Sequence, residues 1–231
     1  MCPLHVSDSD GGLGLCTPLM NFEIIEIDPS GMREKPSSMG GNGIAVVMPA
    51  IDLAVAVGSA RRMLAFAGMP CRLVVAHDFI RQGFIATANM MSAALEAEFI
   101  AYVAQDALAG QDWLRLAHER ISVTGAGLCG FNDGKFNGKL ATFGLVRTAF
   151  TQKLYGQGRI FHEAYRAHRA DEELTWLAHL AGKYCYAPGA LLMEVDFRLQ
   201  RAINPDDTKL YAERKPRFQA MAAALAKSEA E

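Results

Sequence analysis

Residues 99–106 read FIAYVAQD, an apolar run that ends at an acid, Asp106. Continuous apolar runs of this length are typical of strands that are buried on both faces of a parallel sheet. Similar runs occur earlier, at 44–48 (IAVVM) and 71–76 (CRLVVA), and a helix-like segment follows each of them. The alternation of strands and helices predicts an α/β fold, an α/β/α sandwich with a mainly parallel central sheet.

The rest of the chain is divided by turn-forming residues and by helix-capping residues. The expected helices are 53–67 (capped by Asp52), 86–97, 112–119 and 171–181, and the further expected strands are 22–27, 121–125, 139–146 and 191–197. Apart from the run at 22–27, the first part of the chain is rich in glycine, proline, serine and aspartate. We therefore expect an irregular N-terminal extension over 1–43, one α/β domain over 44–204 and a helical tail over 205–231.

The composition excludes several classes of protein. Of the 231 residues, 51% are hydrophobic and 21% are charged, which is ordinary globular usage. The formal net charge of −2 argues against a surface that binds nucleic acid or an anionic membrane over its whole extent. Five cysteines without a CxxC pair favour reduced thiols. The apolar stretches are broken by polar residues and the first residues lack a signal-like pattern, so we expect a cytoplasmic protein without a membrane span.

Familiar catalytic motifs are missing from the sequence. There is no GxGxxG after the first strand, no P-loop, no GxSxG and no HExxH, and the six histidines show no metal-ligand spacing. Acids instead follow the three expected strands, as Asp52, Asp78 and Asp106. Because ligands of α/β sheets bind beyond the carboxyl ends of the strands, these acids mark the expected site.

Five segments occur in an order that resembles the large, mostly inverting family of nucleotide-sugar-dependent glycosyltransferases with the GT-A fold. These are Pro49 at the end of the first strand, Asp78 at the end of the second, Asn89 in the helix before the third, AYVAQD (101–106) with DWL (112–114), and ADEEL (170–174) with Gly182. The resemblance covers roughly residues 44–197. It implies a GT-A domain that moves one sugar from a nucleotide donor with inversion.

The resemblance implies a role for each matched residue. The donor nucleotide would be bound by Pro49, Asp52, Asp78, Asn89 and Gln105. Asp106 would anchor a divalent cation, Mn²⁺ or Mg²⁺, which suits hard carboxylate oxygens. The family's D-x-D is reduced here to Ala104–Gln105–Asp106, so one acid remains, and an Asp106 that merely starts a loop is the alternative.

The second half of the chain would supply the base and the acceptor side. Asp171 matches the family's base, with Glu172 next in line, although Asp171 also fits a helix N-cap. Glu194 and Asp196 share one face of the last expected strand, where one of them would complete the cation's ligands or both would face solvent. Candidate acceptor or sugar contacts are Glu173, Tyr165, Trp176 and Arg169, and the aromatic residues among them are equally suited to a core.

A basic segment suggests the nature of the acceptor. Residues 134–169 contain seven Lys or Arg and one Glu. Such a segment on the acceptor side would suit an anionic acceptor, which is a charged glycan, a lipid-linked phosphate or a modified DNA base, as in bacterial or phage enzymes. A solvated face balanced by the acidic N-terminal segment is the alternative. The competing functions are a non-catalytic sugar- or nucleotide-binding module and a pyrophosphorylase-like nucleotidyltransferase, and an oligomer formed through the extension stays open.

Overall fold

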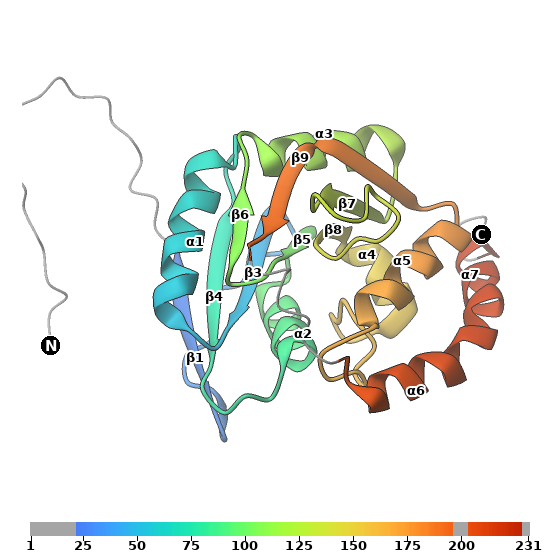
Figure 1. Cartoon of the computed structure of the whole chain (residues 1–231), viewed down its shortest axis with the longest axis horizontal. Helices are drawn as coiled ribbons and strands as arrows, with labels where there is room; N and C mark the ends of the chain where they lie inside the picture. Colours follow the sequence, from blue (N-terminus) through green and yellow to red (C-terminus); the bar gives the residue numbers. More distant parts are fainter. Residues whose placement is uncertain (1–21, 196–202, 228–231) are drawn as a thin grey trace, which may run out of the picture.

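The computed structural model describes residues 22–195 and 203–227, and Figure 1 shows their arrangement. The strands are β1 Glu23–Asp28, β2 Gly31–Met32, β3 Ile44–Ala50, β4 Arg72–Asp78, β5 Phe99–Tyr102, β6 Ala107–Ala109, β7 Leu128–Asn132, β8 Gly144–Arg147 and β9 Tyr184–Glu194. The helices are α1 Leu53–Phe66, α2 Phe84–Leu95, α3 Trp113–Thr124, α4 Thr148–Tyr155, α5 Ala170–Leu180, α6 Pro205–Arg214 and α7 Phe218–Lys227, with a 3₁₀ turn at Lys215–Arg217.

The strands form one sheet in the order β2-β1-β4-β3-β5-β8-β7-β9-β6. Strands β1, β4, β3 and β5 are parallel, β8 is antiparallel to both of its neighbours, and β7 is parallel to β9. The expected mainly parallel α/β sheet is therefore confirmed. The carboxyl ends of β3, β4, β5 and β7 consequently lie along one edge of the sheet, which we call the carboxyl edge.

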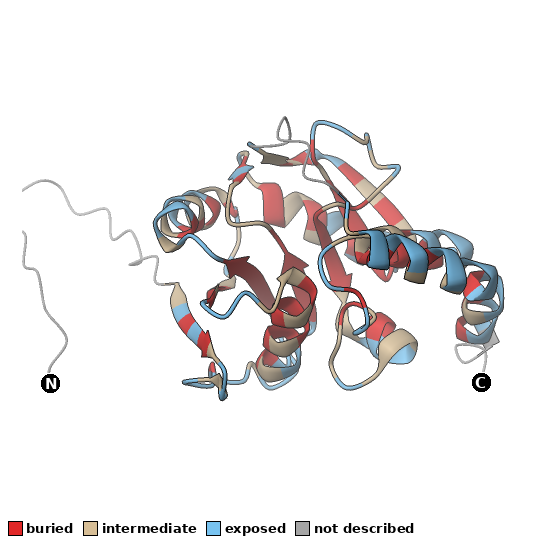
Figure 2. Ribbon diagram, turned by 60° about the horizontal axis from the view of Figure 1, so that its bottom comes forward, coloured by how far each residue is buried: buried red, intermediate tan, exposed pale blue. Residues whose placement is uncertain are grey.

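Two apolar clusters cover the two faces of the sheet (Figure 2). One contains the inner residues of α1 and α3 together with alternate residues of β3, and the other contains those of α2, α4, α5, α6 and α7. Local signals fit these elements. Asp52 accepts a hydrogen bond from the N–H of Val55 and so caps α1, while Asn204 caps α6 in the same way and Pro205 follows it.

The strand expected at 22–27 is confirmed as β1, and its position is informative. It pairs in parallel with β4, with Glu23 opposite Val74 and Ile27 opposite Asp78. Ile25 and Ile27 are buried there. A strand from the segment that we expected to be irregular therefore extends the central sheet.

The prediction of a strand at 121–125 was wrong, because residues 121–124 form the last turn of α3. Branched side chains suggested a strand, but Leu114, Ala117 and Ile121 share one helix face and are fully buried, while Val123 is 85% exposed. The strand in this region is β7, which begins at Leu128. The strand expected at 139–146 is shorter than expected and begins at Gly144, and α4 was not expected at all.

No helix within the two described ranges is long and apolar enough to cross a membrane.

Candidate active site at the carboxyl edge

Gln105 joins two loops of the carboxyl edge. Its Oε1 accepts hydrogen bonds from the backbone N–H groups of Ile51, at 2.8 Å, and of Asp52, at 2.9 Å. The loop after β5 thereby fixes the loop after β3. These bonds bring together Gln105 and Asp52, which we expected to contact the donor. Pro49, which we also expected to contact the donor, lies in the buried end of β3. These donor contacts stay predictions.

Asp78 organises the loop between β4 and α2. Its Oδ1 accepts from the N–H of Gln82 and its Oδ2 from the N–H of Gly83, both at 2.9 Å, and the side chain is buried. Gly83 has a φ of +109°, and a Cβ there would lie 2.7 Å from the carbonyl oxygen of Arg166. The loop after β4 is therefore held by Asp78 and packs against the segment that precedes α5. A contact between Asp78 and the donor base stays a prediction.

Asn89 has a structural task that the sequence did not reveal. Its Nδ2 donates to the carbonyl of Phe161 at 3.0 Å, and its Oδ1 accepts from the N–H groups of Ile160 and Phe161 at 3.1 and 2.9 Å. The side chain is 8% exposed. The structure commits this amide to the backbone of 160–161, and the donor contact of Asn89 stays a prediction. Asn89 instead fastens the segment after α4 to α2.

Asp106 and Glu194 occupy neighbouring positions of an antiparallel strand pair. Ala107 lies opposite Glu194 in the β6–β9 register, and the N–H of Val195 donates to the carbonyl of Asp106 at 3.4 Å. Asp196 lies outside the described residues. Among the residues described, no group of three or more His, Cys, Asp or Glu is arranged to hold a metal ion. Because Ala107 and not Asp106 lies opposite Glu194, and adjacent side chains of a strand point to opposite faces, the register does not bring these two carboxylates together.

Asp171 sits at the beginning of α5, next to the end of β5. Its backbone carbonyl accepts from the hydroxyl of Thr175 at 2.7 Å, and that hydroxyl accepts from the N–H of Ala141 at 3.1 Å. The phenol of Tyr102, the last residue of β5, donates to the carbonyl of Ala141 at 2.7 Å. These bonds tie together α5, β5 and the loop before β8, and they place Asp171 at the carboxyl edge.

The protonation of Asp171 is shifted by its surroundings. Burial raises the pKa of the half-buried carboxyl to about 6, and the neighbouring Glu172 also raises it. Backbone N–H groups at the helix start and the charge of Arg169 act in the opposite direction. A carboxylate with this pKa is ionised near neutral pH and is still basic enough to accept a proton.

Glu172 and Arg169 pair with each other. The guanidinium of Arg169 forms an ion pair with Glu172 and lies 5.8 Å from the ring centre of Tyr211 on α6. Glu172, the second candidate for the base, is therefore paired with Arg169, which we expected to contact the acceptor. Arg169 adopts a φ of +69° just before α5, a conformation that a residue other than glycine adopts at a cost.

Two of the residues expected to contact the acceptor, Glu173 and Tyr165, are buried in this structure. Glu173 is fully buried, and its Oε2 accepts from the phenol of Tyr165 at 2.8 Å and from Nε of Arg214 at 2.7 Å. The ring of Tyr165 is only 2% exposed. Neither side chain offers a surface to a sugar. They belong to the packing between α5 and α6.

Trp176 is 47% exposed but points elsewhere. It follows Asp171 by five residues, which places it about 140° around α5. The ammonium of Lys215 lies 6.0 Å from its ring centre. The helix geometry therefore does not favour Trp176 as a surface on which a sugar stacks beside Asp171.

Sequence reasoning missed the contribution of α6. Asp207 is 1% exposed, and its two oxygens accept from the N–H groups of Arg166, Ala167 and His168 at 2.8–2.9 Å. This carboxylate fixes the segment that leads into Asp171. The sequence NPDD at 204–207 signals a helix start, but nothing in it indicates a partner 40 residues away.

The basic segment 134–169 is divided between the two edges of the sheet. Arg147 pairs with Glu98 near the amino end of β5, since β8 runs antiparallel and Arg147 lies opposite Phe99. Exposed lysines at 135 and 139 lie instead in the loop that joins the carboxyl end of β7 to β8. Part of the positive charge thus flanks the carboxyl edge.

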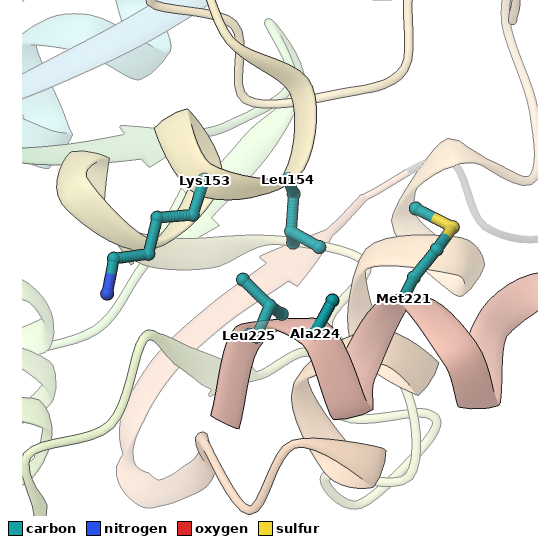
Figure 3. A pocket seen from close by; sticks show the side chains of 5 residues that line it. All are labelled: Lys153, Leu154, Met221, Ala224 and Leu225. Carbon is teal, nitrogen blue, oxygen red and sulfur yellow. The ribbon is translucent and has the colours of Figure 1, made fainter. Parts of the chain in front are cut away.

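A hollow of about 340 Å³ lies between α4 and α7, distant from these residues, and Figure 3 shows its lining, Lys153, Leu154, Met221, Ala224 and Leu225. A smaller hollow of about 70 Å³ beside it includes residues 125–127, Arg147 and Lys183, which precede or follow strands at the amino edge. The candidate site therefore rests on the strand ends and on their acids.

Solved structures resemble this fold. Staphylococcus aureus TarS 1–349 in complex with UDP-GlcNAc matches with a TM-score of 0.55 at 13% identity, over 80% of this chain and 70% of that chain. A second structure of Staphylococcus aureus TarS 1–349, whose description names no ligand, matches with a TM-score of 0.53 at 14% identity. The chain has the GT-A fold. A mutant of Drosophila β-1,4-galactosyltransferase 7 in complex with manganese, UDP-Gal and xylobiose, also a GT-A protein, matches with a TM-score of 0.51 at 15% identity, over 71% of this chain and 78% of that chain.

No protein-family model matches the sequence, and no curated protein matches it. At these identities the likeness establishes the fold of this GT-A chain, and its chemistry has to be argued from its own residues.

Proposed function

We propose that this GT-A chain is a glycosyltransferase that moves one sugar from a nucleotide-sugar donor to an acceptor hydroxyl. The observation that carries the proposal is the carboxylate of Asp171, whose pKa of about 6 suits a general base at the carboxyl edge. The neighbouring loops after β3 and β5 are joined by Gln105, which is a suitable arrangement for holding a nucleotide. The ligands named with similar structures, UDP-GlcNAc and UDP-Gal, belong to the same donor class.

In the proposed reaction Asp171 accepts the proton of the acceptor hydroxyl, while the oxygen of that hydroxyl attacks the anomeric carbon of the donor sugar. The bond from that carbon to the donor diphosphate breaks, and the nucleoside diphosphate leaves. A direct displacement of this kind inverts the anomeric centre. Glu172 is paired with Arg169, so Asp171 is the better placed of the two acids for this role.

Asp106 is the residue that would hold a divalent cation, Mn²⁺ or Mg²⁺, while the register turns the second candidate, Glu194, to the other face of the strand pair. The carboxylate oxygens of Asp106 suit such an ion, and a single protein ligand leaves further positions for donor phosphate oxygens and water. A bound cation would neutralise charge on the leaving diphosphate. The acceptor is proposed to be anionic, because Lys135, Lys139 and Arg166 are exposed near the edge.

A thermal-shift experiment tests the donor class. UDP, GDP, CDP, ADP and dTDP are each added with and without Mn²⁺, and the unfolding midpoint is measured. A ligand at 100 times its dissociation constant adds about 2.7 kcal/mol to the free energy of unfolding, which gives a clear shift. We expect a metal-dependent shift with one nucleotide.

The variant Asp106→Asn should remove the metal-dependent part of that shift, and the exposed Asp206→Asn serves as its matched control. A shift that persists unchanged in Asp106→Asn removes Asp106 from the cation site. Stabilisation by a nucleotide without turnover of any nucleotide sugar would favour a non-catalytic binding module.

A further inference from the structure

Two cysteines face each other across the parallel strands β7 and β9. Cys129 lies opposite Cys185 in the register of this strand pair. Opposite residues of neighbouring strands point to the same face of a sheet. Both side chains accordingly belong to the apolar cluster that contains the inner residues of α3, and Figure 1 shows this helix beside the two strands. The two thiols therefore lie together on the α3 side of the sheet.

The spacing of the strands suits a bond between the two sulfur atoms. Neighbouring strands lie about 4.7–4.9 Å apart, and a disulfide needs Cα atoms about 4.4–6.8 Å apart. Both cysteines are free thiols in this structure. The backbone thus already has the separation that a disulfide requires, while the sulfur atoms are still reduced.

The two thiols differ in how easily they ionise. A hydrogen bond from the thiol of Cys129 lowers the pKa of Cys185, and the hydroxyl of Thr124 and the charge of Arg120 act in the same direction, against the effect of burial. The same hydrogen bond and burial raise the pKa of Cys129. The thiolate is the nucleophilic form of cysteine, so Cys185 is the sulfur that reacts first.

Cys185 is also the one nearer to solvent. Its side chain is 6% exposed, whereas that of Cys129 is fully buried. Thr124, which contacts Cys185, is exposed and is the last residue of α3. Helix ends open at a low cost in free energy. A small reagent therefore reaches Cys185 by the opening of one terminal turn, and Cys129 lies behind it.

We infer that Cys129 and Cys185 form an oxidisable pair, which a hydroperoxide such as hydrogen peroxide converts into a disulfide between β7 and β9. The thiolate of Cys185 attacks one peroxide oxygen, so that an S–O bond forms, the O–O bond breaks and the departing hydroxide takes up a proton to become water. The sulfur of Cys129 then attacks the sulfur of this sulfenic acid and loses its proton. The S–S bond forms, the S–O bond breaks, and a second water leaves. The two sulfur atoms lose two electrons in total, and the peroxide gains them.

Cys71 provides an internal comparison. Burial raises the pKa of its thiol to about 11, so little of it is thiolate. It immediately precedes β4, and the three strands β3, β5 and β8 separate β4 from β7. A disulfide cannot span that distance. Cys71 should therefore stay reduced while the pair reacts.

Peptide mapping of the full-length folded protein tests the inference. The protein is treated briefly with hydrogen peroxide, the remaining thiols are blocked with iodoacetamide, and trypsin digestion follows without reductant. We expect the peptides 121–135 and 184–198 to be joined, with a mass two hydrogens below the sum of their reduced masses. Dithiothreitol should separate them. Linkage of Cys71 at the same rate, or oxygenated Cys185 without any link to Cys129, overturns the inference.

Three variants test the order of the two steps. In Cys129→Ala the reaction should stop at the sulfenic acid of Cys185, which dimedone traps. In Cys185→Ala the oxidation of Cys129 should slow about tenfold or more, because Cys129 is buried and its pKa is raised. The matched control Cys71→Ala should form the 129–185 link at the unaltered rate. Oxidation of Cys129 that is as fast without Cys185 as with it contradicts the proposed pair.

The nucleotide-dependent thermal shift is measured on the same preparations before oxidation. Neither cysteine belongs to the candidate site at the carboxyl edge, so the two results are separate. A nucleotide shift without the disulfide rejects the oxidisable pair and leaves the proposed function intact. The disulfide without any nucleotide shift has the opposite meaning.

Discussion

Arg214 on α6 binds both carboxylate oxygens of Glu173 on α5. Its Nε donates to Oε2 at 2.7 Å and its Nη2 donates to Oε1 at 2.8 Å, and the Glu173 side chain is fully buried. The phenol of Tyr165 donates to the same carboxylate. Since α5 begins with Asp171, this buried group fixes the helix that presents the proposed base.

Breaking this pair should be costly. Arg214→Ala leaves the buried charge of Glu173 without its cation, and we expect the free energy of unfolding to fall by about 3–5 kcal/mol. Urea denaturation measures it. Arg217→Ala, an exposed arginine three residues later, should change it by less than about 0.5 kcal/mol. The double variant Glu173→Leu/Arg214→Met should recover much of the loss, and a double variant as unstable as Arg214→Ala would contradict this account.

Asp207 and Asp206 offer a matched comparison on α6. Asp207→Ala removes the acceptor for the N–H groups of Arg166, Ala167 and His168, whereas Asp206→Ala changes an exposed neighbour. We expect Asp207→Ala to cost about 2–4 kcal/mol, because it leaves several partly buried donors unpaired. Limited trypsin digestion should cleave the variant faster after Arg166 and Arg169. Equal digestion rates for the two variants would refute the role of Asp207.

Turnover should depend on Asp171. Asp171→Asn keeps the shape of the side chain and removes its basicity, so turnover should fall by about 10²-fold or more while nucleotide binding persists. In the unaltered protein, kcat/KM should rise with pH across the region near 6, where the carboxyl loses its proton. The rate with the nucleotide sugar identified by thermal shift is the measurement, and full turnover in Asp171→Asn would move the base elsewhere.

The same residue should lower stability at neutral pH. Its pKa is raised from 3.8 to about 6, so the folded protein holds a proton between these values that the unfolded chain has released. The free energy of unfolding therefore falls as pH rises through this window. Asp171→Asn lacks this loss and should be more stable at pH 7 by about 1–2 kcal/mol, after allowance for solvent screening. Urea denaturation of Asp171→Asn and of the unaltered protein at about pH 4 and at pH 7 measures this difference. A variant that is no more stable than the unaltered protein at pH 7 contradicts the raised pKa of Asp171.

Gln105 should act on donor binding through the loop after β3. Gln105→Ala removes the acceptor of the Ile51 and Asp52 N–H groups, so the donor KM should rise about tenfold with a smaller change in kcat. Gln105→Glu keeps an acceptor oxygen at the same position and should retain the bonds. If both variants leave KM unchanged, the loop does not contact the donor.

Local patterns explain why much of the sheet could be predicted. The apolar runs of β3, β4 and β5 are buried on both faces, so their sequences are nearly continuous in apolar residues. Asp171 was predicted as the base because the sequence around it matched a known pattern. Its altered pKa depends on packing, which no local pattern contains.

The structural features that the sequence did not reveal have a common physical cause. Tyr165 and Glu173 were expected at a sugar surface, but α6 covers them through contacts with Arg214, 41 residues away. Asn89 was expected at the donor, yet its partners lie 71 and 72 residues along the chain. Residues 121–124 continued a helix because their buried face, and not their branched side chains, decided the outcome. Long-range partners and burial were invisible to spacing arguments.

The bonds from Asp207 and Arg214 also determine when during synthesis the proposed base can reach its final position. Asp171 leaves the ribosome well before α6 does, and until residue 214 has emerged the entry to α5 lacks both of its anchors. A growing chain would thus carry its sheet and its proposed base without a fixed geometry for catalysis. Translation products that stop before residue 214 would therefore lack the fixed geometry that the proposed base needs.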